Sequence, residues 1–158
     1  MRDQSSTGSR RREDDGAPAY RTPSQARRNV RCAAVGFSTG MTTTEGSAAA
    51  VRTALEAKYG VKLGVVITDS FGRPWRRGTA GVAIGCAGIP STIDLRGKPD
   101  LFGRILEVSI IGFADEVAAA ASLLQGQAAE GQPVVIVRGL SWDAPEMPVS
   151  DMVRPPEE

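Results

Sequence analysis

The chain has 158 residues, of which 41% are hydrophobic, and this is enough for one modest core. Its net charge of +1 and aromatic content of 5% argue against a nucleic-acid or membrane partner. It has no histidine, which excludes histidine bases and ligands, so any metal must take oxygen ligands. Cys32 and Cys86 fit no metal spacing and predict reduced thiols in a cytoplasmic protein. No apolar run reaches the roughly 18 residues of a membrane span.

Residues 1–31 carry scattered arginine, serine, glycine and proline and almost nothing to bury. Such a composition predicts a disordered, arginine- and serine-rich tail. The arginines at 10–12 could contact an acidic partner, but the acids at 13–15 neutralise them and argue against a transit peptide. Residues 32–158 are left for one domain.

Apolar residues with helical spacing predict a helix that begins near Thr44 or Ser47 and ends before Gly60, a natural C-cap. The apolar residues 61–68 then predict a buried strand that leads to an acid. Residues 79–86 are apolar with interspersed glycine and fit either a strand or a helix.

Residues 92–95 predict a short strand, and residues 105–112 alternate well enough to predict another. The clearest helix spans 113–127, with acids in its first turn, where the helix dipole favours them. Residues 134–138 predict a buried strand, so this helix lies between two strands, as in a crossover unit. We therefore expect an α+β (mixed α/β) domain with a mixed sheet and flanking helices.

The segment from Asp69 to Arg77 is the first candidate site. A carboxylate followed by the Ser70 hydroxyl at the end of a buried strand can supply oxygen ligands to a hard cation. The turn beyond carries three arginines, and Arg73 and Arg76 are candidate contacts to phosphate or substrate. The alternative is that Asp69 caps the turn and the arginines form a solvated face.

The loop between the second helix and the last strand is the second candidate site. It is rich in glycine and amides, and its backbone amides or the Gln127 carbonyl could contact a nucleotide or its metal. The alternative is an ordinary helix C-terminus with Gly131 as the stop signal. It is not a Walker A loop, because no G-x-x-x-x-G-K-[ST] is present, and there is no G-x-G-x-x-G turn.

These segments together resemble one known family. The resemblance rests on the Asp69 motif with its Gly-Arg-Pro-Trp turn and on further segments in the expected order: 68–76, 82–85, 94–103, 114–116, 125–127 and 134–139. The family is coenzyme F-420:L-glutamate ligase, the γ-glutamyl ligase of a deazaflavin coenzyme. The similarity runs from about Val61 to Glu158 and corresponds to the C-terminal part of the ligase domain.

The resemblance implies a GTP-dependent ligase that joins L-glutamate to the coenzyme precursor through an amide bond, by way of an acyl phosphate. It implies a divalent cation, Mg or Mn, with a monovalent cation as a further candidate, and an intertwined homodimer. By resemblance Asp69, Ser70 and Gln127 are the metal-site residues: Asp69 matches a metal-ligating acid, Ser70 the hydroxyl residue at a second metal, and Gln127 a position near metal and nucleotide. No catalytic residue is assigned. The implied nucleotide-binding residues are Gln125, Gly126, Gln127, Ala128, Ala129, Glu130, Gly131 and Gln132.

The chain also departs from the family pattern. The family's longer front half has no counterpart here, Ser38 and Met41 stand where an acid and an asparagine are expected, and Gly81 replaces an acid. A truncated or frameshifted product, a fragment completed by a second chain, or a divergent relative would each explain this. The alternative function is an inactive homologue that at most binds nucleotide or coenzyme; a purely structural or interaction module is a third reading.

Overall fold

A computed structural model describes residues 31–36 and 44–156. The predicted tail up to residue 30 and the positions Ser38 and Met41 lie outside the described residues. The elements in chain order are β1 (Arg31–Gly36), α1 (Thr44–Tyr59), β2 (Leu63–Arg73), β3 (Arg76–Ala87), β4 (Ile93–Asp94), β5 (Ile110–Ile111), α2 (Phe113–Gln125), β6 (Val134–Val137) and the short 3-10 helix η1 (Val149–Met152).

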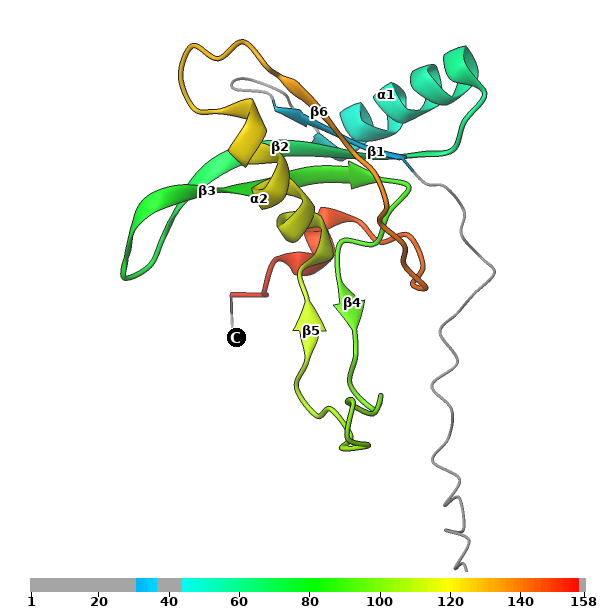
Figure 1. Cartoon of the computed structure of the whole chain (residues 1–158), viewed down its shortest axis with the longest axis vertical. Helices are drawn as coiled ribbons and strands as arrows, with labels where there is room; N and C mark the ends of the chain where they lie inside the picture. The colour runs from blue at the N-terminus through cyan, green and yellow to red at the C-terminus, as the bar shows by residue number, and fades with distance from the viewer. Residues whose placement is uncertain (1–30, 37–43, 157–158) are drawn as a thin grey trace, which may run out of the picture.

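The main sheet has four strands in the order β3-β2-β1-β6. β1 and β2 run parallel and are joined through α1, whereas β3 and β6 pair antiparallel at the two edges. β4 and β5 form a separate two-stranded sheet at the base of an arm that projects from the domain (Figure 1). The fold is thus α+β with a mixed sheet, as the sequence predicts.

The first half of β2 is buried on both faces of the sheet. Val65 and Ile67 pack with Ala48 of α1, while Val66 packs on the other face with Val117 and its neighbours in α2. Each such side chain contributes roughly 1.5–3 kcal/mol by leaving water. This double burial explains why the segment reads as a continuous apolar run instead of an alternating one.

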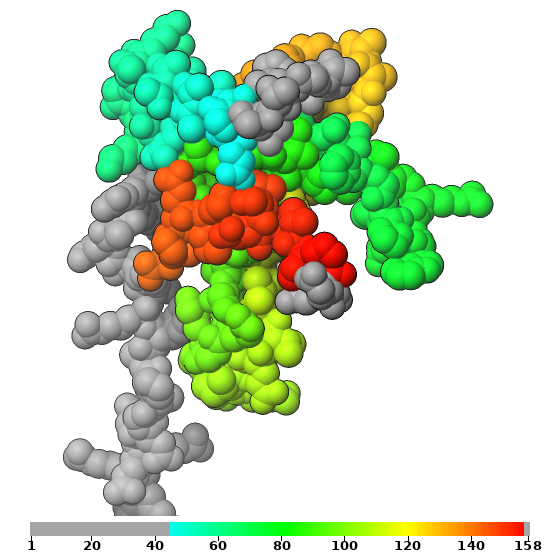
Figure 2. Space-filling model, turned by 180° about the vertical axis from the view of Figure 1, so that it is seen from behind, coloured from blue at the N-terminus to red at the C-terminus, as the bar shows by residue number. Residues whose placement is uncertain are grey.

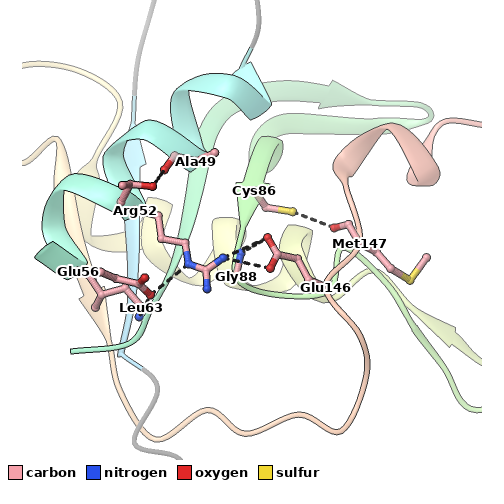
Figure 3. A network of polar contacts seen from close by, with 9 residues as sticks. Ala49, Arg52, Glu56, Leu63, Cys86, Gly88, Glu146 and Met147 are labelled. Atoms are coloured by element: carbon pink, nitrogen blue, oxygen red, sulfur yellow. Dashed lines mark hydrogen bonds and ion pairs between the residues drawn. The ribbon is translucent and has the colours of Figure 1, made fainter. Parts of the chain in front are cut away.

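An ionic network ties α1 to the segment that follows β6 (Figure 3). Arg52 donates to Glu146 at 3.1 Å and to Glu56 at 3.2 Å, and Glu56 also accepts the Leu63 backbone N–H. Glu146 in turn accepts the Gly88 N–H at 2.7 Å. Gly88 has φ +79, and a Cβ there would lie 2.5 Å from the Leu63 carbonyl oxygen, so the close approach requires glycine.

The same C-terminal segment also contributes to the core. Trp142 packs against Phe113, the first residue of α2, with ring centroids 5.5 Å apart. Glu45 in the first turn of α1 accepts backbone N–H bonds from Val149 and Ser150 at the start of η1. Figure 2 shows this segment, in orange to red, lying across the domain beside α1. Residues 140–153 are therefore an integral part of the domain.

The structure corrects several expected boundaries. The strand expected to end at residue 68 continues as β2 to Arg73, and the turn is only Pro74–Trp75. Residues 79–86 are strand, because they pair along the length of β2. The helix expected over 113–127 ends at Gln125.

Two expected strands also differ. Only Ile110–Ile111 of the expected strand 105–112 pairs with β4, since the preceding residues belong to the arm, where Val108 is exposed. β6 is an edge strand with Val134 and Ile136 half-exposed, so it is not buried. The sequence predicts that α2 lies between two strands as in a crossover unit, but β5 and β6 belong to different sheets. The parallel crossover unit of the structure is β1-α1-β2.

In the part of the chain that the structure describes, neither helix is long and apolar enough to cross a bilayer. Cys86 is a free, buried cysteine, which agrees with the expected reduced thiol. Burial raises the pKa of its thiol to about 12, which keeps it protonated.

Trp75 provides a test of the hairpin geometry. It is fully exposed and has φ +56 at the second turn position after Pro74, where a bulky residue is strained. Asparagine tolerates this conformation, so Trp75→Asn should raise the free energy of unfolding by up to about 1 kcal/mol in urea denaturation. A fall of that size would mean that Trp75 makes stabilising contacts.

Candidate functional site

The two candidate segments of the sequence meet at one open groove of about 570 Å³. One wall is β2 at the point where β1 ends, and the other is the end of α2 with the loop that follows it. The lining residues are Thr68, Asp69, Ser70, Ser122, Gln125, Gly126, Gln127, Ala128, Gly131, Gln132 and Pro133. Because the carboxyl ends of parallel strands are where α/β sheets bind ligands, the position of the groove beside the β1–β2 pair suits a ligand site.

A bulge shapes the β2 wall. The register between β2 and β3 shifts between Ile67 and Thr68, so β3 carries one extra residue, Ile84. Next to it, the Ala83 N–H donates to the Asp115 carboxylate in the first turn of α2 at 2.8 Å. Bulges re-aim side chains beside functional sites, and here the bulge with its helix contact fixes α2 against the sheet at the groove.

Thr68 and Ser70 lie on the face of the sheet that packs on α2. The Thr68 hydroxyl donates to the Gln125 side-chain carbonyl at 3.3 Å. Ser70 pairs with Gly81, where an added Cβ would lie 2.6 Å from the Ala118 carbonyl oxygen. The expected acid at position 81 is therefore incompatible with this close approach of β3 to α2.

Asp69 occupies the opposite face by the alternation of the strand and forms the rim of the groove. Its Oδ1 accepts the Ser70 backbone N–H at 2.7 Å. Asp69 is exposed, which leaves the rest of its carboxylate accessible to a ligand.

Backbone and side-chain hydrogen bonds hold the other wall. The Gly126 N–H closes α2 on the Ser122 carbonyl, and Gly126 has φ +73, which favours glycine. The Gln125 amide donates to the Pro133 carbonyl at 3.3 Å while its oxygen accepts from Thr68. Gln125 thus joins β2, α2 and the start of β6 across the groove.

Glu130 organises the loop without lining the groove. Its carboxylate accepts the Ala128 N–H at 2.7 Å, and this bond, with further backbone N–H bonds of Glu130 and Gln127, lowers its pKa. Ala129 and Glu130 are absent from the lining, whereas the other predicted nucleotide-binding residues are present. Arg73 and Arg76 lie beyond the groove on the β2–β3 hairpin.

The donors present fit a hard divalent cation. Asp69 offers one carboxylate, and neither the Ser70 hydroxyl nor the Gln127 side chain has a protein partner among the described residues. No three acidic or cysteine side chains cluster in residues 31–36 and 44–156. Mg²⁺ and similar ions usually take one or two carboxylates and fill the rest of the shell with water and phosphate, so this donor set suits a nucleotide-bound ion.

Sequence reasoning assigned no role to Thr68 or Ser122. Thr68 is buried and links the walls, and Ser122 donates its hydroxyl to the Ala119 carbonyl at the edge of the groove. Ser122 lies three residues before Gln125, so the helical period that places Gln125 at the groove could also have identified Ser122.

Fold and groove together define an α+β domain with an oxygen-lined site at the carboxyl end of a parallel strand pair. The family model described as F420-0:Gamma-glutamyl ligase matches residues 42–139, and the chain belongs to this family. The sequence resemblance runs from about Val61 to Glu158, whereas the family model matches from residue 42, before Val61, to Gly139.

Curated relatives named coenzyme F420:L-glutamate ligase are similar to the chain. The protein of Methanothermobacter thermautotrophicus is 49% identical over 98 residues, which are 62% of this chain and 39% of that protein. Those of Methanocaldococcus jannaschii and Archaeoglobus fulgidus are each 44% identical, over 71% and 72% of this chain and 45% of their own length. The chain thus spans less than half the length of the relatives it matches.

Gly81 gives a steric test of the groove wall. Gly81→Ala would force a Cβ against the Ala118 carbonyl and Ser122, and should lower the free energy of unfolding by about 1–3 kcal/mol in urea denaturation. The matched control is Gly72→Ala on the same hairpin, where a Cβ meets nothing within 4 Å. Equal effects of the two substitutions would contradict the close packing.

The loop contact of Glu130 predicts a pH dependence. Because the folded-state pKa is lowered, the contact stabilises the loop above the ordinary value of 4.5 and is lost as pH falls through the lowered pKa. The Ala128 amide proton, followed by NMR from pH 7 to 3, should shift with a midpoint below 4.5. Glu130→Gln should abolish this titration, and a midpoint above 4.5 would contradict the contact.

Proposed function

We propose that this domain carries the nucleotide and metal site of a GTP-dependent ligase, which adds L-glutamate through a γ-glutamyl amide bond to the precursor of coenzyme F420. Membership of the F420-0:Gamma-glutamyl ligase family supports the reaction class. The observation that carries the proposal is the single groove formed by Asp69–Ser70 and the loop after α2.

In the proposed reaction a carboxylate oxygen of the precursor attacks the γ-phosphorus of GTP. The bond from that phosphorus to the GDP oxygen breaks, and an acyl phosphate forms. The amine of glutamate then attacks the acyl carbon, phosphate leaves with its electron pair, and the nitrogen loses a proton to water. The product is an amide.

The groove residues have distinct proposed roles. Backbone amides of the loop after Gln125, kept in place by Glu130, would contact the nucleotide. Asp69 at the rim would hold one Mg or Mn ion, and Ser70 with Gln127 inside the groove would hold a second. The bound ions offset the negative charge of the triphosphate. Thr68 and Gln125 position the two walls relative to each other.

The alternative is a homologue without ligase activity that binds nucleotide or coenzyme. It predicts GTP binding with no amide product when glutamate and precursor are supplied.

Calorimetric titration of GTP into the full chain, with and without Mn²⁺, tests the proposal. We expect Mn²⁺-dependent binding that Asp69→Asn weakens by about tenfold or more, because a neutral amide is a far poorer cation ligand than a carboxylate. Asp143→Asn is the control, since Asp143 is exposed and does not line the groove. Binding that is unaffected by Mn²⁺ or by Asp69→Asn would refute the metal assignment.

A further inference from the structure

The distal half of the β2–β3 hairpin projects free of both helices (Figures 1 and 2). β1 pairs with β2 only as far as Thr68, so beyond that residue β2 is paired with β3 alone. Residues 71–79 are all exposed. This two-stranded ribbon begins at the rim of the groove.

One face of the ribbon carries an ordered row of side chains. Val65 and Ile67 point toward α1, and strand alternation places Asp69 and Phe71 on the same face. Between Gly72 and Arg73 the register with β3 shifts, and Arg73 follows at the end of β2. Across the ribbon, Arg73 is paired with Arg76. We call Asp69, Phe71, Arg73 and Arg76 the hairpin strip.

The length of the hairpin strip follows from the backbone of β2. Residues two apart in a strand are about 7 Å apart, so an acid, an aromatic ring and a guanidinium follow one another over about 14 Å. Phe71 is 51% exposed, and the residue paired with it is the small Ala80, so the ring remains accessible from the solvent side.

The distal end of the strip is positively charged without compensation. The sequence has no Asp or Glu between Asp69 and Asp94. Within the described residues, neither Arg73 nor Arg76 forms an ion pair, and the side chain of Arg73 donates only to the Arg77 carbonyl. Two adjacent guanidinium groups of this kind suit a phosphate.

We propose that the hairpin strip binds a planar aromatic ring system that carries a phosphate. The ring stacks on Phe71, as aromatic side chains on exposed sheet surfaces stack with planar rings, and the phosphate binds between Arg73 and Arg76. The inference rests on the proposed function, because it makes the strip the docking surface for the deazaflavin precursor beside the groove.

Flavin mononucleotide and riboflavin are suitable probes, because they share a ring system and differ in the phosphate. Flavin fluorescence is titrated with the full chain. The Arg73→Gln/Arg76→Gln double variant should weaken binding of flavin mononucleotide about tenfold or more and leave riboflavin unchanged. Phe71→Leu should weaken both ligands by a similar factor, about fivefold or more. Arg104→Gln, an exposed arginine on the arm, is the matched control.

Several results would overturn the inference. One is that the unmodified chain does not bind flavin mononucleotide, and another is that the hairpin variants bind it with the same affinity as Arg104→Gln. A third such result is that the chain binds a single-stranded oligonucleotide more tightly than flavin mononucleotide and that the same variants abolish this binding. GTP titrations of the variants separate the two proposals. Intact GTP binding with no flavin binding refutes ligand binding by the hairpin strip and leaves the proposed function standing. Flavin binding that depends on the strip, without GTP binding, supports the strip and refutes the proposed function.

Discussion

The burial of β2 between α1 and α2 is the constraint on which the rest of the structure depends. Apolar contacts on both faces fix residues 63–68 in the sheet, and the hydrogen bond from Ala83 to Asp115 adds a polar attachment between β3 and α2. Because the strand continues without a break, this fixed half also positions Asp69 and Ser70 at the groove and carries the hairpin beyond it.

The residues of the groove are held by a few hydrogen bonds between elements, β2 and α2, whose positions are fixed by packing. The Thr68–Gln125 bond of 3.3 Å joins the two walls. The Gln125–Pro133 bond of 3.3 Å closes the loop, which Glu130 also organises. The Thr68–Gln125 and Gln125–Pro133 bonds join neutral groups, so each contributes only about 1 kcal/mol, and the position of the walls is set mainly by helix and strand packing.

The C-terminal segment lies outside the family match but contributes to the packing of the domain. The family match ends at Gly139, yet Trp142 packs on α2 and Glu146 joins Arg52 to Gly88. Residues outside the matched region therefore complete the core that supports the groove. Conversely, half-exposed apolar residues on the edge strand β6 and on the arm leave surface that the described residues do not cover.

The sequence by itself determined both helices, the course of β2 up to Asp69 and the two segments that line the groove, because helical periodicity, apolar runs and turn residues are local signals. Tertiary structure decided the continuation of β2 to Arg73, the edge position of β6 and the meeting of Ser70 with Gln127. These depend on pairing between strands far apart in the chain and on the bulge beside Thr68, and no local pattern specifies which strands pair or in what register.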